Sequence, residues 1–374
     1  MKIGVITFSQ SQDNYGQILQ CYAMQCFLQQ LGHEPFLIRY AEPAPPVPRF
    51  WLRKLLTYLL HIRLYLRWWL HQRRIARDER RYSHPEQTPN RRFTEFLQQH
   101  LRMTTLYTRE ELLSSPPAAD VYLCGSDQIW GGDDLYYLSF APRGARRIAY
   151  APSFGGVRIT DPVQRRQVAA YLRAFEYIGM REHSGVEQCR ELGRPDAEQV
   201  CDPTLLLSRE DYDRLAVAPS EREPYLLLYL LGSSIDCELD DIRRFAAGLG
   251  KKLIYVASQG RYDDAPKCYP SIGEWLGLIR HADGVITNSF HGVVFSLIYH
   301  KPFLALALSR HFRRMNGRVE ELLSALHMND RICRSHLPLS LEPPLDFSAF
   351  DRYRRAHRDK TVQLFRRFCP LNTP

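Results

Sequence analysis

The sequence predicts a two-domain α/β protein with parallel sheets covered by helices. Three observations lead to this prediction. The 374 residues are 45% hydrophobic, which is enough apolar material for more than one core. Short apolar runs alternate with segments of helical periodicity from residue 2 onwards, and the same alternation starts again after a polar stretch at residues 221–224. Strands joined through helices pair in parallel, so each series predicts a doubly wound sheet.

The first domain is expected to comprise residues 1–220, and it begins with a β–α–β unit. Residues 2–8 form an apolar run, residues 17–31 carry apolar side chains at helical spacing, and residues 35–40 form the second strand. Gly32 is expected to end the helix, since glycine accepts the left-handed conformation of a C-terminal cap. Further strands are expected at residues 120–125, 146–151, 177–181 and 199–202.

Residues 41–100 are predicted to be a helical insertion in this domain. The segment from Phe50 to Leu70 is rich in Trp and Leu, but Arg and Lys interrupt it too often for a membrane-spanning helix. One interpretation is a basic amphipathic helix that lies on a membrane surface. The other is a helix packed on protein, with its Arg side chains extending into solvent. The Arg-rich residues 73–81 are expected to be a solvated face.

The second domain is expected to comprise residues 221–346. A charged helix at residues 347–374 is expected to follow it and to cross back to the first domain. The predicted strands of the second domain are residues 225–231, 252–258, 284–287 and 302–308. Helical segments separate them, so this series also predicts a doubly wound sheet.

The composition indicates which classes of partner and which cellular compartment to expect. The formal net charge of +9 favours anionic partners, but no zinc-finger or RNA-recognition motif accompanies it, so nucleic acid is not an expected partner. The nine cysteines show no C-x-x-C spacing, which is typical of reduced thiols. The first residues lack the apolar stretch of a signal peptide. We therefore expect a cytoplasmic protein, peripheral on the inner face of the membrane if residues 50–70 lie on a bilayer.

Polar clusters follow four predicted strands, at the ends where open α/β sheets bind ligands. His291 lies between an apolar strand and a helix with small first residues, whose backbone N–H groups would face an anion. There the imidazole would serve as an acid or a phosphate ligand, or it would only cap the turn. The four clusters are residues 13–16, 125–128, 179–182 and 288–292.

Other candidate residues lie in or near these clusters. Arg181 is suited to hold a carboxylate or phosphate through two hydrogen bonds, although a strand-end Arg is often a salt-bridge residue. Arg313 and Arg318 would close over an anion, and Arg318 is favoured because it begins an apolar-periodic helix. Asp127 would act as a base or bond to its own turn. The remaining expected substrate contacts are Asn14, Asn288 and Ser289.

In this order, the clusters resemble the polysaccharide pyruvyl transferase family. The resemblance spans nearly the whole chain and leaves out residues 50–81. The matching segments are Thr7-Phe8 with Asn14-Tyr15-Gly16 and Leu19-Gln20, Cys124-Gly125-Ser126-Asp127-Gln128-Ile129-Trp130, Ile148-Ala149-Tyr150-Ala151 with Ser153-Phe154-Gly155, Arg181-Glu182 with Ser184-Gly185, Asp202-Pro203-Thr204-Leu205-Leu206-Leu207, Thr287-Asn288-Ser289-Phe290-His291-Gly292 with Phe295-Ser296, and Gly317-Arg318 with Leu322-Leu323.

The resemblance implies two Rossmann-like domains similar to GT-B glycosyltransferases, with the active site in the cleft between them. Members of the family transfer the enolpyruvyl unit of phosphoenolpyruvate to a sugar as a pyruvate ketal, in building surface and extracellular polysaccharides. By position, Arg181 and His291 match residues that contact the donor. Many members carry Arg where this chain has Ser289, so Arg318 or Arg313 would supply that anion contact here. The implied partners are phosphoenolpyruvate and a saccharide acceptor, either free or lipid-linked.

The resemblance also implies a mechanism. Arg181 and Arg318 would hold the donor, and His291 would protonate its methylene carbon. Sugar hydroxyls would attack the resulting cation, with Asp127 as the candidate base. The sequence shows no metal-ligand cluster and no cofactor motif, so neither a metal nor a cofactor is expected.

Two other functions stay open at this point. The same fold hosts glycosyltransferases with a nucleotide-sugar donor, which would need a carboxylate for the ribose, such as Glu274 or Glu320. The other is a non-catalytic, membrane-docked scaffold of a polysaccharide assembly complex. The segment from Phe50 to Leu70 suggests a scaffold, whereas the polar strand-end clusters argue for a ligand site.

Overall fold

The computed structural model describes residues 1–41, 70, 73, 77, 91–232, 235, 237–258, 263–308, 315–338, 340–341 and 344–370. The amphipathic helix expected from Phe50 to Leu70 lies outside the described residues, apart from Leu70 itself. Most of the Arg-rich segment at residues 73–81 also lies outside them, as does Arg313.

The first sheet has the strand order β3-β2-β1-β4-β5-β6-β7, and all paired neighbours run parallel. The order reverses between β1 and β4, so the carboxyl ends of these two strands border a crevice. The strands are β1 (Lys2–Ile6), β2 (Glu34–Tyr40), β3 (Met103–Tyr107), β4 (Val121–Cys124), β5 (Arg146–Tyr150), β6 (Tyr177–Met180) and β7 (Glu198–Gln199).

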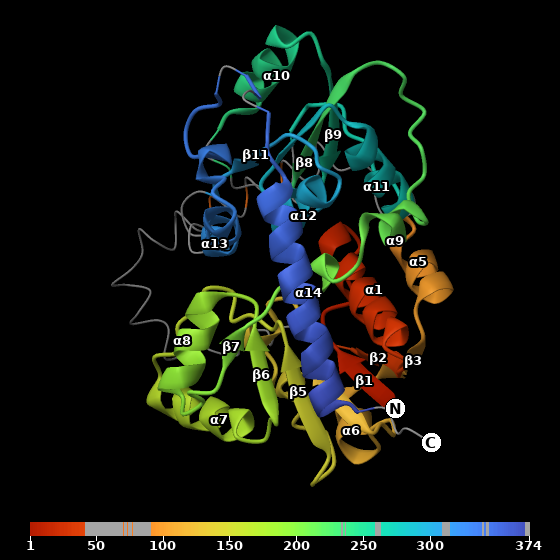
Figure 1. The fold of residues 1–374 in the computed structure, drawn as a ribbon, viewed down its shortest axis with the longest axis vertical. Coiled ribbons are helices and arrows are strands. Elements are labelled where there is room, and N and C mark those ends of the chain that lie inside the picture. Colours follow the sequence, from red (N-terminus) through yellow and green to blue (C-terminus); the bar gives the residue numbers. More distant parts are fainter. Residues whose placement is uncertain are drawn as a thin grey trace.

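Helices cover this sheet, and the first turn of α1 (Tyr15–Gln30) lies next to the second domain (Figure 1). Asn14 begins α1, since its side chain accepts a hydrogen bond from the backbone of Gln17. Gly32 has a φ of 85°, in agreement with the predicted C-terminal cap. The other helices of this part are α5 (Phe93–His100), α6 (Arg109–Ser114), α7 (Pro162–Leu172), α8 (His183–Glu191), α9 (Arg209–Asp213) and the 3-10 turns η1 (Ile129–Gly131), η2 (Asp134–Tyr137) and η3 (Pro203–Leu205).

The second sheet has the order β12-β11-β10-β8-β9, again with all paired neighbours parallel. Its order reverses between β8 and β10, so a second crevice lies at the carboxyl ends of these strands. The strands are β8 (Tyr225–Leu230), β9 (Lys252–Ala257), β10 (Gly284–Thr287), β11 (Phe303–Leu306) and β12 (Ile332–Cys333). The helices are α10 (Leu239–Gly248), α11 (Ile272–His281), α12 (Phe290–Ile298), α13 (Gly317–Ala325) and the 3-10 turn η5 (Asn329–Arg331).

The last helix, α14 (Ser348–Phe368), runs from the second domain along the first (Figure 1). At its start, Asp351 lies 3.1 Å from the imidazole of His300 in the second domain. Further along, Thr361 hydrogen-bonds the hydroxyl of Tyr150 in β5, and Phe365 packs edge-on against Phe27 of α1. The helix therefore crosses back to the first domain, as the sequence predicted.

Tyr15 joins the two domains at the first turn of α1. Its ring stacks on that of Trp275 in α11, with 4.9 Å between centroids, and its hydroxyl donates to the carbonyl of Pro270. A single apolar cluster includes buried side chains of both domains, among them Tyr15, Phe27, Trp275 and Phe295. The two carboxyl edges therefore face each other across a packed seam.

Several elements differ from the sequence-based expectation, among them the strands β3, β7 and β12. β3 was not expected, because its residues are partly exposed and polar, as is common for an edge strand. The strand expected at residues 199–202 is β7, and Asp202 instead begins the turn η3. Among the described helices, none has the length and apolar character needed to span a membrane.

Candidate active site

The loops after β4, β6 and β7 of the first sheet meet the loop after β10 of the second. This junction brings together Asp127, Arg181, Asp202 and His291, all of which are buried. Arg318, near the start of α13, reaches the same group from the second domain. Predicted candidates from sequence positions as far apart as 127 and 318 therefore share one site, because each parallel sheet places its carboxyl ends at one edge and the two edges meet at the domain seam.

Arg181 lies at the centre of this site, directly after β6, and is only 6% exposed. Its Nη1 is 3.2 Å from Asp202 Oδ2, its Nη2 is 3.9 Å from Asp127 Oδ1, and its Nε is 3.6 Å from Glu182 Oε2. Burial by itself would lower the pKa of Arg181, but the three carboxylates outweigh burial and raise it. Arg181 thus stays charged.

The charge of Arg181 is balanced, but its hydrogen-bonding capacity is not used up. Among the described residues, neither Nε nor Nη2 has a hydrogen-bond partner. Buried donors without partners are uncommon in folded proteins, and they mark places where a ligand or water binds. These two nitrogens form one edge of the guanidinium, which is the geometry that binds a carboxylate or phosphate through two oxygens.

His291 is the second residue of α12, and its imidazole is 5% exposed. Its Nε2 lies 3.6 Å from Asp202 Oδ2 and has no hydrogen-bond partner among the described residues. The opposite side of the ring packs against the backbone of α1 at Gly16, where an added Cβ would overlap the imidazole. Gly16 is therefore required by the close approach of His291 across the domain seam.

Arg318 approaches Arg181 from the second domain. The guanidinium carbon of Arg318 lies 5.9 Å from the centre of the Phe290 ring, and that of Arg181 lies 5.4 Å from the same point. Burial and the neighbouring positive charge of Arg181 lower the pKa of Arg318 to about 10. With the Gln128 amide oriented to present its oxygen, that oxygen accepts from Arg318 at 2.9 and 3.2 Å. Two like charges are thus held close together, which favours an anion between them.

Asp127 lies in the loop after β4 with a φ of 85°, a left-handed conformation that is uncommon for a non-glycine residue. Its Oδ1 accepts from the backbone of Gln128 at 2.8 Å, and its Oδ2 lies 3.4 Å from Gln17 Nε2. At 9% exposure it is the most accessible of the three carboxylates around Arg181. Asp127 therefore bonds to its own turn and also borders the site, and its role as a base stays a prediction.

The side chains of three other candidate residues form hydrogen bonds with the backbone of nearby loops and helix ends. Asn14 caps α1, and Ser289 caps α12 by accepting from the backbone of Gly292. Asn288 exchanges two hydrogen bonds of 2.8 Å with the backbone of Leu231 at the end of β8. Substrate contact by these three residues stays a prediction.

Sequence reasoning gave no role to two acidic residues that complete the site. Asp202 accepts from Ser126 Oγ at 2.8 Å in addition to its contact with Arg181. Glu182 accepts from Ser153 Oγ, while its Oε2 has no hydrogen-bond partner in the described part of the chain. Each of them comes within three residues of the end of a strand. That position in the sequence could have identified both as candidate site residues.

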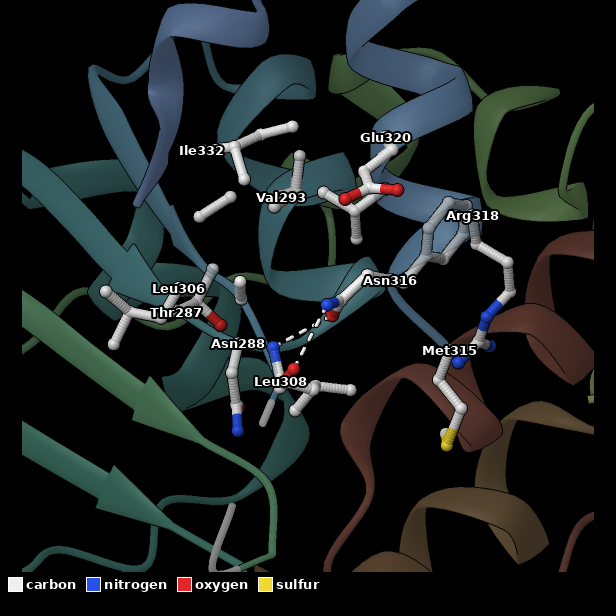
Figure 2. A pocket seen from close by; sticks show the side chains of 14 residues that line it. Thr287, Asn288, Val293, Leu306, Leu308, Met315, Asn316, Arg318, Glu320 and Ile332 are labelled. Atoms are coloured by element: carbon white, nitrogen blue, oxygen red, sulfur yellow. Dashed lines mark hydrogen bonds between the residues drawn. The ribbon is translucent and has the colours of Figure 1, made fainter. Parts of the chain in front are cut away.

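A small pocket, partly open to solvent, adjoins the site on the side of the second domain. It lies beyond the ends of β10 and β11, between the first turns of α12 and α13. Figure 2 shows apolar side chains such as Val293 and Leu306 around it, with Asn316 hydrogen-bonded to Leu308. Arg318 extends away from this lining toward the first domain, so the charged group lies at the pocket's edge (Figure 2).

Comparison with solved structures shows likeness of fold. A Listeria monocytogenes protein described as a UDP-N-acetylglucosamine 2-epimerase is 9% identical with a TM-score of 0.50, covering 100% of this chain and 98% of its own. The UDP-N-acetylglucosamine 2-epimerase of Neisseria meningitidis is 9% identical, with a TM-score of 0.43 and coverage of 98% and 91%. A Streptomyces glycosyltransferase complexed with thymidine diphosphate is 15% identical, with a TM-score of 0.44 and coverage of 98% and 99%.

The fold prediction is confirmed: the chain has two Rossmann-like domains in the manner of GT-B enzymes. No curated protein matches the sequence. The profile of the polysaccharide pyruvyl transferase family matches residues 14–310, which include Asp127, Arg181 and His291. The chain therefore belongs to the polysaccharide pyruvyl transferase family, a family of transferase enzymes.

Proposed function

We propose that this enzyme transfers the enolpyruvyl unit of phosphoenolpyruvate to a saccharide, where it forms a pyruvate ketal. The observation that carries this proposal is the edge of Arg181 formed by Nε and Nη2, which have ion-pair neighbours but no hydrogen-bond partner among the described residues. The guanidinium of Arg318 lies near the same Phe290 ring as that of Arg181. Phosphoenolpyruvate carries a carboxylate and a phosphate on adjacent atoms. Two neighbouring guanidinium groups match these two anionic groups.

In the first step, His291 gives the proton on Nε2 to the methylene carbon of the donor. The carbon–carbon double bond supplies the electron pair, so a methyl group forms and positive charge develops on the central carbon. His291 is suited to this step because its Nε2 faces the site and is not committed to another hydrogen bond in the described residues.

In the second step, one sugar hydroxyl forms a bond to the central carbon and loses its proton to a base. Asp127, as the most accessible carboxylate, fits that role. The bond from carbon to the phosphate oxygen then breaks, and a second hydroxyl bonds to the same carbon. The two hydroxyl protons balance the proton taken up by the methylene carbon and the proton carried away by the phosphate.

The carboxylates that a nucleotide-sugar donor would need are occupied. Glu274 accepts from the backbone of Ser271 at 2.7 Å in the cap of α11, and Glu320 pairs with Arg334 at 2.9 Å. A carboxylate accepts more than one hydrogen bond, so these contacts do not decide between the donors, and the phosphoenolpyruvate proposal rests on the two guanidinium groups of Arg181 and Arg318.

Calorimetric titration tests the donor. Phosphoenolpyruvate is titrated into the wild type and into Arg181→Ala and Arg318→Ala, with Arg173→Ala as a basic control at the end of α7. We expect binding by the wild type and the control, and a loss of at least about tenfold in each site variant. Binding of a uridine or thymidine diphosphate sugar, with none of phosphoenolpyruvate, would contradict the proposal.

We also propose that the enzyme works in the cytoplasm on an acceptor that is free or lipid-linked. All nine cysteines are free thiols, as in proteins of reducing compartments. Contact with the membrane through residues 50–70 lies outside the described residues. Co-sedimentation with anionic vesicles tests it: binding lost on changing Trp68 and Trp69 to Ser supports a surface helix, and equal binding by this variant excludes one.

A further inference from the structure

Helix α13 of the second domain contacts the first domain through two side chains. Arg318 and Glu321 are three positions apart, so they lie on the same face of the helix. The amide oxygen of Gln128 accepts from Arg318 at 2.9 and 3.2 Å. Glu321 Oε2 accepts from the backbone N of His183 at 2.9 Å and from Gln199 Nε2 at 3.3 Å. All of these partners belong to the first domain, so this face of α13 crosses the domain seam.

The backbone N–H of His183 needs an acceptor from outside its own helix. His183 begins α8, and the first N–H groups of a helix have no partner within it. The preceding residue, Glu182, makes no capping hydrogen bond with its side chain, and its Oε1 accepts from Ser153 Oγ instead. Glu321 therefore supplies, from the second domain, the acceptor that a capping residue supplies in many helices.

The hydrogen bond of Glu321 matters more for this contact than its charge does. Burial raises the pKa of the Glu321 carboxyl, the His183 N–H opposes that rise, and the nearby carboxylate of Glu182 adds to it. The surroundings thus favour an oxygen acceptor at this place without favouring a negative charge. A glutamine at position 321 would keep such an oxygen and remove the charge.

The residue before it, Glu320, has a different partner. It pairs with Arg334 of the second domain at 2.9 Å. In Figure 2 its carboxylate lies beside the pocket, whereas Arg318 extends toward the first domain. Two successive glutamates of α13 are thus bound to different domains, and Glu321 is the one that joins α13 to α8.

Arg318 lies where its positive charge is unfavourable while the site is empty. Burial and the charge of Arg181 lower the pKa of Arg318 to about 10. Repulsion between the two guanidinium groups pushes α13 away from the first domain, so other contacts have to hold it there. Glu321 lies one helical turn beyond Arg318, and a helix is stiff over one turn. Fixing Glu321 on α8 therefore fixes the turn that carries Arg318.

We propose that Glu321 is a positioning residue: by accepting from the start of α8 it docks α13 on the first domain and keeps the guanidinium of Arg318 beside that of Arg181. The effect on the donor rests on the proposed function. The docking itself is a statement about the free enzyme, and it is tested without any ligand.

Hydrogen–deuterium exchange provides the first test. Peptides that cover the start of α8 are followed by mass spectrometry in the free enzyme. In Glu321→Ala the His183 amide loses its acceptor, so exchange there should become roughly two- to tenfold faster. Glu321→Gln keeps an acceptor and should restore most of the protection. Glu320→Ala is the matched control and should leave the exchange rate of these peptides unchanged.

The melting temperature of the free enzyme reports where Arg318 lies. Arg318→Gln removes a charge that Arg181 makes unfavourable, so it should raise the melting temperature. If α13 is no longer docked, the two charges are further apart and less is gained by removing one. The rise produced by Arg318→Gln should therefore shrink by at least about half in a Glu321→Ala background.

The sign of the change in donor affinity separates positioning from a simple effect of charge. Removing a carboxylate near an anion site should by itself strengthen the binding of phosphoenolpyruvate. If Glu321 positions Arg318, Glu321→Ala should instead weaken binding by roughly two- to tenfold, the free energy of the lost hydrogen bonds. Glu321→Gln should bind at least as well as the wild type. In an Arg318→Ala background, Glu321→Ala should have no further weakening effect.

Each result supports the inference or overturns it. Unchanged exchange at the start of α8 in Glu321→Ala, or an undiminished rise in melting temperature on Arg318→Gln, overturns it whatever the donor is. Stronger donor binding by Glu321→Ala also overturns it. If the wild type binds no phosphoenolpyruvate, the proposed donor fails, and exchange and melting still decide the docking. Circular dichroism checks that Glu321→Ala folds, as expected for a half-buried side chain, and Glu321→Ser replaces it if it does not.

Discussion

The ring of Tyr15 lies parallel to the ring of Trp275, with an angle of 7° between them and 4.9 Å between centroids. The two residues belong to different domains, and the hydroxyl of Tyr15 donates a 2.6 Å hydrogen bond to Pro270 in the same seam. Tyr15 is followed directly by Gly16, against which His291 packs. The contact that joins the domains therefore also fixes the distance between the halves of the site.

Tyr15→Phe is expected to lower the free energy of unfolding by about 1 kcal/mol, because it removes one buried hydrogen bond. Tyr15→Leu should cost a further ~0.5–1.5 kcal/mol through loss of the stacked pair. Urea denaturation measures both. Tyr122→Phe is the control, since its hydroxyl bonds Pro117 within the first domain. Affinity for phosphoenolpyruvate should fall in the Tyr15 variants and stay unchanged in the control; equal affinity in all of them would argue that the seam does not shape the site.

Gly16→Ala is expected to be both destabilising and inactive. The new methyl group overlaps the imidazole of His291, and overpacking of this kind costs ~1–3 kcal/mol. Combining it with His291→Ala should recover much of the stability, since the clashing ring is gone, but none of the activity. Thermal unfolding and turnover of the two single variants and the double variant check this. Strictly additive losses of stability would show that Gly16 and His291 do not contact each other in solution.

Asp202 should make the protein sensitive to acid. Burial raises the pKa of a carboxyl group, but here His291 and Arg181 outweigh burial and hold the pKa of Asp202 well below its usual range. A lowered pKa contributes stability that is complete above the unfolded value of about 3.9 and is lost as the pH falls below it. The stability difference between the wild type and Asp202→Asn should therefore be large at pH 6 and shrink between pH 4 and pH 2.5. A difference that stays constant over this range would contradict this linkage.

Arg318→Gln is expected to have opposite effects on stability and binding. The pKa of Arg318 is lowered by burial and by Arg181, which means that its charge is unfavourable in the empty site. Removing the charge should raise the melting temperature of the free enzyme and reduce the further rise that phosphoenolpyruvate produces. Arg334→Gln, which removes an exposed partner of Glu320, is the control and should leave the ligand-induced rise unchanged. A lower melting temperature of free Arg318→Gln would show that the empty site tolerates both charges.

The sequence predicted those residues of the site that can be recognised from their position after a strand. Arg181, His291 and Asp127 each follow a strand, and the carboxyl ends of parallel strands lie at one edge. Recognising the strands was therefore enough to place Arg181 and Asp127 at one edge, whereas the meeting of His291 with them depends on how the two sheets face each other. Arg318 was found for a different reason, because a helix that begins near this edge carries its first side chains into the site.

The roles of residues that depend on contacts brought together by the fold could not be predicted from the sequence pattern. Nothing near Gly16 in the sequence signals that the imidazole of His291 will pack on its backbone. The two oxygens of Asp202 differ only through the groups that the fold brings to each of them. Similarly, the amide side chain of Asn288 is of a type that often binds substrates. Only the structure shows that it is hydrogen-bonded to the backbone of Leu231 instead.

The return of α14 to the first domain has a mechanical consequence. In the described part of the chain, the backbone passes between the domains twice, once before β8 and once before α14. The second passage adds a covalent link, with the contacts of α14 to Tyr150 and Phe27, to the seam that Tyr15 and Trp275 already hold. Parting the domains would therefore have to break the contacts of α14 as well as the seam, which ties the two halves of the site together as one unit.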